Sequence, residues 1–235
     1  MIGIIGAMQV EIDGLKAMLK DAAATRISGI DFVTGRLHGH EVVLAVCGVG
    51  KVFAALCAQT MILRFGVRAI INTGVAGTLC PQLGIGDVAI ARQVVQHDMD
   101  TSPLGDPVGL LSGINQVYLP ASSTLSNLVA QVVGEKGMNY KLGTIATGDQ
   151  FLATEERKRW IHSTFDAIAG EMEGGSIGHV CYVNQIPFAV IRTISDDADG
   201  NVPNNFADFA AETARSAISI TAAVLERLND EQELD

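Results

Sequence analysis

The sequence is short of basic residues, with 16 Lys and Arg against 26 Asp and Glu and a formal net charge of -10. A surface that binds nucleic acid or an anionic membrane needs clustered Lys and Arg, because it has to neutralise phosphate groups. The shortage therefore argues against both kinds of partner. We expect no nucleic acid and no membrane as partner, and a small, uncharged or cationic ligand.

Long apolar runs are also missing. The runs "VVLAV" and "AIINTGVAG" are much shorter than the roughly 18 to 20 apolar residues that span a bilayer. The N-terminus has neither the basic flank nor the small-residue cleavage site of a signal peptide, since Met1 leads into a strand-like run and then to Glu11 and Asp13. These absences predict a cytoplasmic protein.

Cysteine is scarce and scattered. The chain has Cys47, Cys57, Cys80 and Cys181, with no C-x-x-C pair and no histidine nearby at metal-ligand spacing. Free cysteine is among the residue types most often buried in protein interiors. We therefore predict reduced, buried thiols and no metal site built on them.

The apolar content that is present predicts a single domain. A chain of 235 residues that is 48% hydrophobic can bury one core and is too short for two comfortable ones. Short β-rich runs alternate with amphipathic stretches, which is typical of an α/β fold. We predict one domain over residues 1–228 and an acidic, solvated C-terminal tail over residues 229–235.

The order of these runs predicts the elements. We expect strands over residues 1–5, 32–37, 41–47, 67–74, 86–96, 141–149 and 188–196, and helices over residues 8–19, 48–66, 123–136, 154–162 and 206–228. A further strand should lead into "GEMEGGSIGHVCYV", and residues 98–119 form the longest irregular segment. Long loops in compact domains are commonly functional.

The first strand ends in a glycine turn, which raises the question of a phosphate site. "MIGIIGAMQVEI" has Gly3 and Gly6 alone and lacks the G-x-G-x-x-G fingerprint of dinucleotide binding. "GVGKVF" lacks the Ser or Thr that follows Lys in a Walker A loop. The turn must therefore serve another purpose, and the acidic residue it delivers into a helix is Glu11.

Polar residues follow several of the expected strands. In "GEMEGG" an extended backbone would place Glu171 and Glu173 on one face and Met172 on the other. "VIRTISDDADG" runs an apolar strand into Arg192, Ser195 and Asp196. Ligands of open α/β sheets bind outside the carboxyl ends of the strands, so these residues are candidates for a site.

The ordered motifs resemble those of the 5'-methylthioadenosine/S-adenosylhomocysteine nucleosidases. They are "IGIIGAM" with Glu11 just beyond it, "GVGKV", "INTGVAGTL", "TGDQF", "EMEGGSIGHVC", "VIRTISDDAD" and "NNFADF", and together they span nearly the whole chain. The resemblance implies a purine nucleoside phosphorylase-like fold with a mixed, twisted central sheet flanked by helices. It also implies a homodimer that acts on an adenine nucleoside without metal or organic cofactor.

The family chemistry assigns the two catalytic residues. Hydrolysis of an N-glycosidic bond needs a proton for the leaving base and an activated water, and a pair of carboxyl groups supplies both in glycosyl hydrolysis. By resemblance, Asp196 is the acid at adenine N7 and Glu11 is the base for the water. From the residues alone, Glu11 could equally favour a helix dipole, and Asp196 could be a turn former with Asp197 or Asp199 in its place.

The resemblance also assigns the binding residues. Glu173 would accept hydrogen bonds from the ribose hydroxyls, Met172 would lie against the sugar, and Phe151 would stack on adenine. The remaining assignments are Leu152 at the adenine edge, Arg192 and Ser195 as orienting groups, Met8 and Phe206 at the thioalkyl end, and Val49, Thr101 and Leu104 closing that end from the partner subunit. We interpret Glu171 as structural.

Two departures from the family pattern affect the site. Val75 stands where many members have a serine near the ribose, and Leu104 stands where familiar members have an aromatic residue. The valine removes one hydrogen-bond partner and bears on the catalytic rate more than on the reaction type, whereas the change at Leu104 opens the question of the group at the 5' position. The alternatives are a nucleoside phosphorylase, which would need arginines for its phosphate, and a non-catalytic nucleoside-binding protein.

Overall fold

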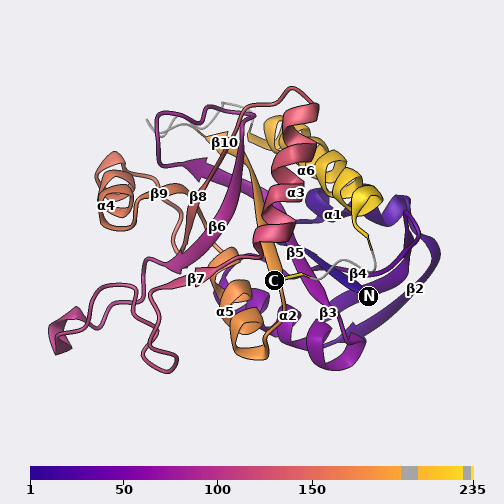
Figure 1. Cartoon of the computed structure of the whole chain (residues 1–235), viewed down its shortest axis with the longest axis horizontal. Coiled ribbons are helices and arrows are strands. Elements are labelled where there is room, and N and C mark those ends of the chain that lie inside the picture. Colours follow the sequence, from indigo (N-terminus) through magenta and orange to yellow (C-terminus); the bar gives the residue numbers. More distant parts are fainter. Residues whose placement is uncertain (197–205, 230–233) are drawn as a thin grey trace.

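One ten-stranded sheet runs through the molecule, and helices cover it on both sides (Figure 1). This computed structural model describes residues 1–196, 206–229 and 234–235. The strands are β1 (Ile2–Gly6), β2 (Lys20–Ile27), β3 (Ile30–Leu37), β4 (His40–Val46), β5 (Ala69–Thr78), β6 (Val88–Gln96), β7 (Tyr118–Pro120), β8 (Tyr140–Thr147), β9 (Ala167–Glu171) and β10 (Phe188–Asp196). The helices are α1 (Gln9–Ala17), α2 (Lys51–Phe65), a 3₁₀ turn η1 (Ser102–Leu104), α3 (Ser123–Glu135), α4 (Glu155–Phe165), α5 (Gly174–Asn184) and α6 (Phe206–Arg227).

The sheet is mixed and partly closed on itself. Strand β5 pairs in parallel with β1 and β10 and in antiparallel with β9, while β10, β6, β8 and β9 pair in that order. These five strands therefore form a ring, and β1, β4, β3 and β2 extend it as an open sheet. The single-domain α/β fold with a mixed central sheet is thus confirmed.

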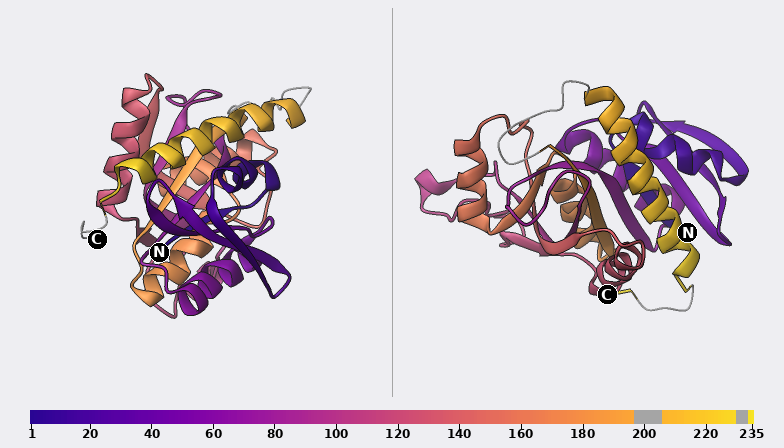
Figure 2. Two further views of the ribbon diagram at one scale, coloured as in Figure 1. Left: turned by 90° about the vertical axis from the view of Figure 1, so that its right-hand side faces the viewer. Right: turned by 90° about the horizontal axis from the view of Figure 1, so that it is seen from above.

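Each side of the sheet carries its own apolar core. Helices α1 and α3 pack on α6 over one side, and α2 packs on α5 over the other (Figure 2). Residues that alternate along one strand point to opposite sides, so Ile4 of β1 joins the first core and Ile5 joins the second. Helix α4 stands apart at the end of the ring, on a smaller apolar cluster that includes Ile161 and Phe165. The sheet thereby holds the strand ends rigidly where α1, α4 and α5 begin.

Two elements differ from the sequence interpretation. Strand β2 was not expected, and it pairs with β3 although its side chains are exposed along nearly its whole length. The segment after Glu171 turns into helix α5 within three residues instead of continuing as a strand. The second difference changes how the two glutamates of "GEMEGG" are placed.

The C-terminal tail is held at its end rather than fully solvated as expected. The Asp235 carboxylate accepts hydrogen bonds from the Thr124 amide at 2.9 Å and the Ser122 hydroxyl at 3.1 Å, at the start of α3. Helix N-termini favour negative charge because their first amides have no partner within the helix. The chain end thus ties back to α3.

All four cysteines are buried free thiols, as the sequence predicts. In the described part of the chain, no helix is long and apolar enough to cross a bilayer.

Candidate active site

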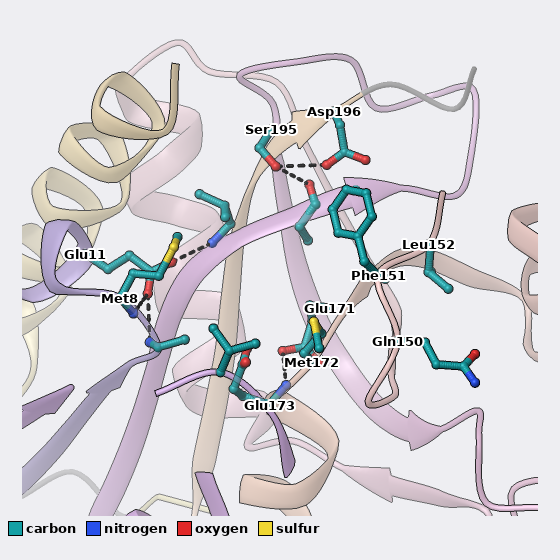
Figure 3. Close-up of a pocket in the computed structure, with 16 residues that line it drawn as sticks. Met8, Glu11, Gln150, Phe151, Leu152, Glu171, Met172, Glu173, Ser195 and Asp196 are labelled. Atoms are coloured by element: carbon teal, nitrogen blue, oxygen red, sulfur yellow. Dashed lines mark hydrogen bonds between the residues drawn. The ribbon is translucent and has the colours of Figure 1, made fainter. Parts of the chain in front are cut away.

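A cavity of about 220 Å³ opens where several strands end (Figure 3). It lies at the ends of β1, β8, β9 and β10, beside the second half of β5. The structure brings ten of the predicted site residues into its lining: Met8, Glu11, Val49, Val75, Phe151, Leu152, Met172, Glu173, Ser195 and Asp196. Residues from most of the length of the chain therefore meet at one place.

Glu11 is held in the cavity wall by the main chain. It lies in the first turn of α1, where its Oε2 accepts hydrogen bonds from the amides of Ala7 at 2.8 Å and Met8 at 2.9 Å. Its Oε1 faces the amide of Val75 at 3.3 Å. Burial raises the pKa of Glu11, and the amide of Met8 and the charge of Arg192 partly oppose that rise. A carboxylate with a raised pKa is better suited to take a proton from water.

Asp196 closes the far end of the cavity, at the last residue of β10. Figure 3 shows it across the cavity from Glu11, with the Phe151 ring directly beneath it. The Ser195 hydroxyl donates to Asp196 Oδ1 at 2.9 Å, and the ammonium of Lys158 lies 3.3 Å from Oδ2. The carboxyl group is therefore oriented from two directions while one edge remains open to the cavity.

Two glycines of β5 make room for these carboxyl groups. A Cβ at Gly74 would lie 2.8 Å from Glu11 Oε1, and one at Gly77 would lie 2.6 Å from Asp196 Oδ2. Real Cβ atoms do not approach that closely, so any larger residue would move the carboxyl groups. The two glycines of the "NTGVAG" motif thus leave the space that the carboxyl groups of Glu11 and Asp196 occupy.

Arg192 lies behind the cavity and ties its acidic wall together. The side chain is fully buried, donates to Asn72 Oδ1 at 2.6 Å, and forms an ion pair with Glu171. Its Nη2 also lies 3.8 Å from Glu173 Oε2. The structure therefore places Arg192 outside the cavity lining, in contact with the two glutamates that belong to it.

Glu171 and Glu173 have different surroundings, and the prediction that both lie on one face of a strand is wrong. Glu171 ends β9 and accepts from the amides of Glu173 at 3.0 Å and Gly174 at 2.7 Å and from the Thr147 hydroxyl. Its oxygens are thereby occupied by protein donors. Glu173 is the N-cap of α5 and accepts from the Gly50 amide at 2.9 Å.

Burial raises the pKa of Glu173 to about 7, and the negative charge of Glu171 adds to that rise. The neighbouring Arg192 guanidinium and the Gly50 amide oppose it. Glu173 is therefore a carboxyl group whose charge changes near neutral pH, in the wall of the cavity.

Apolar side chains line the space between the carboxyl groups. Phe151 follows β8 and is 61% exposed, so its ring face is available to a ligand, whereas Leu152 beside it is buried. Met172 lies at the bend between β9 and α5, and Met8 lies at the start of α1. A flat aromatic face with a soft thioether opposite is suited to a ligand with a planar ring and a sugar.

Val49 lies in the cavity of its own subunit, which corrects its assignment to the partner. The hydrogen bond from the Gly50 amide to Glu173 draws this turn over the cavity. Thr101 and Leu104 do not line the cavity of their own chain. They belong to the η1 segment, which projects away from the body of the molecule, and Leu104 is 83% exposed.

Three predicted or alternative residues fall outside what the structure shows. Asp197 and Asp199 lie outside the described residues. Phe206 begins α6, but its side chain lies outside the described part. In the described part, no group of three or more His, Cys, Asp or Glu is arranged to hold a metal ion.

Sequence reasoning missed Lys158. It lies in the charged helix expected over residues 154–162, yet the lysine is 3% exposed. Arg157, Lys158 and Arg159 are consecutive, and the sequence gives no sign that the middle one is buried while Arg159 is exposed. Nothing in that pattern indicates an acidic partner from the distant strand β10.

Comparison with known proteins defines the class first. Residues 1–226 match the family model described as "Phosphorylase superfamily". The match covers both the ring of strands and the open sheet.

Individual relatives narrow the class. The chain is 38% identical over 229 residues to the 5'-methylthioadenosine/S-adenosylhomocysteine nucleosidase of Staphylococcus carnosus, covering 97% of this chain and 100% of the relative. It is 35% identical over 227 residues to the aminodeoxyfutalosine nucleosidase of Campylobacter jejuni, covering 97% of this chain and 99% of that one. A crystal structure of a mutant Helicobacter pylori nucleosidase with 5'-methylthioadenosine in its active site superposes with a TM-score of 0.92 at 36% identity, covering 97% of this chain and 98% of the other. This chain belongs to the 5'-methylthioadenosine/S-adenosylhomocysteine nucleosidase family of the phosphorylase superfamily.

Proposed function

We propose that this protein hydrolyses the N-glycosidic bond of 5'-methylthioadenosine and S-adenosylhomocysteine. The products are adenine and the 5-thio-substituted ribose, as methionine salvage requires. The observation that carries the proposal is the pair of carboxyl groups, Glu11 and Asp196, that face one another across a single cavity of nucleoside size.

The proposed mechanism uses each carboxyl group once. Asp196 gives its proton to adenine N7 while the bond between C1' and N9 breaks and its electron pair moves to the base. Glu11 takes a proton from the water that adds to C1'. Each proton transfer is expected to contribute about 10² to 10⁴-fold to the rate.

The remaining lining residues supply binding. Glu173 accepts hydrogen bonds from the ribose hydroxyls, Phe151 stacks on adenine with Leu152 at its edge, and Met172 contacts the sugar. Met8, Val49 and Phe206 lie at the 5' end, Ser195 orients Asp196, and Arg192 holds Glu173. Val75 contributes its backbone amide, which lies 3.3 Å from Glu11, so a serine hydroxyl at this position is not needed to place the base.

The charge of the cavity favours water over phosphate as the second substrate. Its lining includes four carboxylates, Glu11, Glu171, Glu173 and Asp196, and no Lys or Arg among the described residues. A phosphorylase needs cationic groups in contact with its phosphate, because arginine and phosphate pair through matched hydrogen bonds. An acidic cavity instead repels a phosphate dianion.

We also propose that the protein works as a homodimer in the cytoplasm. Exposed apolar side chains gather on α2 and α5, namely Val52, Phe53, Leu56, Leu63, Tyr182 and Val183. An apolar patch of this kind on a protein marks an interaction surface. A partner seated there would bring its own Thr101 and Leu104 toward the open 5' end of the cavity. Four buried free thiols fit a reducing compartment.

The test is adenine release from 5'-methylthioadenosine in buffer without phosphate and again with phosphate. We expect release that ignores phosphate and yields the free thioribose. Release only with phosphate would make the protein a phosphorylase, and tight nucleoside binding without release would make it a binding protein. Parallel assays with S-adenosylhomocysteine and aminodeoxyfutalosine rank the 5' substituents. Both are needed because a 5'-methylthioadenosine/S-adenosylhomocysteine nucleosidase and an aminodeoxyfutalosine nucleosidase are similar to this chain, at 38% and 35% identity.

A further inference from the structure

Lys158 is a buried cation that contacts the proposed acid without entering the cavity. Its side chain is 4% exposed and its Nζ lies 3.3 Å from Asp196 Oδ2. The lysine does not belong to the cavity lining, whereas Asp196 does. Among the residues that the structure describes, Lys158 is the charged group in contact with this carboxyl group, and Ser195 occupies the other oxygen.

Helix α4 fixes where this ammonium lies. Thr154 caps the helix by accepting from the Arg157 amide at 3.4 Å, and Ile161 and Phe165 anchor it in an apolar cluster with Leu152. The Arg157 guanidinium lies 4.1 Å from the centre of the Trp160 ring. A lysine on a helix held in this way cannot withdraw to solvent without moving the adenine-facing loop before it.

We propose that Lys158 is a positioning residue that strengthens Asp196 as an acid. The inference rests on the proposed hydrolysis. As the proton leaves Asp196 for N7 and the bond to C1' breaks, the carboxyl group becomes a carboxylate next to a buried ammonium. The attraction between the two is weak while Asp196 is neutral and strong once it is charged, so it stabilises the transition state more than the bound substrate.

The same geometry explains why a cation is tolerated in an interior position. A buried ammonium without a charged partner is strongly unfavourable, and the carboxylate of the resting enzyme supplies one. As a nucleoside binds, Asp196 takes up a proton from solvent, and it then passes this proton to N7. Lys158 therefore contributes in the free enzyme and again after proton transfer.

The test compares Lys158→Met with the wild type in an adenine-release assay. We expect kcat to fall by about tenfold or more while KM stays within about threefold, because the charge that favours the carboxylate left after proton transfer is removed and substrate contacts are kept. Lys158→Arg, which keeps the charge, should restore much of the rate.

Controls separate this effect from loss of structure and from failure of the proposed reaction. Arg159→Met removes an exposed cation from the same helix and should leave kcat and KM unchanged. A 4-nitrophenyl 5-thioriboside, whose leaving group departs without protonation, should react at nearly equal rates in Lys158→Met and wild type. If wild type releases no adenine, the proposed function fails; if it does, a Lys158→Met variant with wild-type kcat, or one that slows the 4-nitrophenyl substrate as much as the nucleoside, overturns the role of Lys158. Should that variant not fold, the rates of Lys158→Gln and Lys158→Arg on the two substrates decide in the same way.

Discussion

At the residue scale, the cavity places two carboxyl groups in different supporting environments. Glu11 is held by backbone amides in a buried position, which raises its pKa, whereas Asp196 is held by a hydroxyl and an ammonium. Different surroundings are how proteins give two chemically similar groups separate acid and base roles. The two environments are consistent with the proposed roles of Glu11 as base and Asp196 as acid.

Amide variants of either group test this division. We expect Glu11→Gln and Asp196→Asn each to lower kcat by about 10² to 10⁴-fold, because each removes one proton transfer while keeping the side-chain shape. Nucleoside affinity, measured by calorimetry, should stay within an order of magnitude. Asp13→Asn on the exposed side of α1 is the matched control and should be neutral. Near-normal turnover in both site variants would contradict the assignment.

The charge of Glu173 predicts how affinity depends on pH. Its pKa is raised to about 7, so the group is a carboxylate above that pH and becomes protonated below it. A carboxylate accepts hydrogen bonds from both ribose hydroxyls, whereas the protonated group has less acceptor capacity. We expect KM to rise as pH falls from about 8 to about 6. In Glu173→Gln the KM should be raised and should lose this dependence; an unchanged pH dependence would contradict the role.

At the element scale, strand β5 controls the cavity through the space its glycines leave. Gly77→Ala would place a Cβ 2.6 Å from Asp196 Oδ2 and displace the Asp196 carboxyl group from its position in the cavity. Displacement by about 1 Å at a reacting group can cost about 10²-fold in rate. We expect a loss of that size in kcat, with the melting temperature little changed, measured by adenine release and differential scanning calorimetry.

Gly113→Ala is the control for this substitution, because a Cβ there meets nothing within 4 Å. It should leave both the rate and the melting temperature unchanged. A Gly77→Ala enzyme with full activity would show that β5 or β10 yields more readily than the ring of strands implies.

The elements also show what sequence patterns can and cannot predict. The buried strands β1, β5 and β10 were predicted because a two-sided core requires continuous apolar runs. Strand β2 was missed because "KDAAATRI" has no apolar alternation, and pairing with β3 alone makes it a strand. Helix α5 was missed because it begins with Gly174 and Gly175, which are poor helix formers but leave room for Val190 and Thr147.

In the candidate site, too, local sequence patterns predicted some features and missed others. The lining residues could be named because strand ends and family motifs mark them. The buried state of Lys158 and the different surroundings of Glu171 and Glu173 depend on contacts between distant segments, which a single sequence does not encode in any local pattern.

At the scale of the whole molecule, the proposed dimer would link assembly to substrate recognition through the apolar face of α2 and α5. We expect Leu56→Glu to convert a dimer to a monomer, because burying a charge in an apolar interface is unfavourable. Sedimentation velocity measures the change. KM for 5'-methylthioadenosine should rise by about tenfold or more as the partner's Leu104 segment is lost, a difference of about 1.4 kcal/mol.

The control for assembly is Ile85→Glu, which adds the same charge at another exposed apolar residue, on the turn between β5 and β6. It should remain dimeric with an unchanged KM. A Leu56→Glu monomer with wild-type KM would show that the 5' end of the cavity is complete within one chain.

The hydrogen bonds of Glu11 have a consequence for how freely this sequence can drift. The base is oriented by the amides of Ala7, Met8 and Val75, and every amino acid except proline carries such an amide. Side chains at these three positions can therefore be exchanged to reshape the sugar and 5' regions of the cavity, while the Glu11 carboxyl group keeps its orientation. A saturation library at position 75 should tolerate small residues of any polarity and reject proline, so that specificity can evolve without a passage through an inactive enzyme.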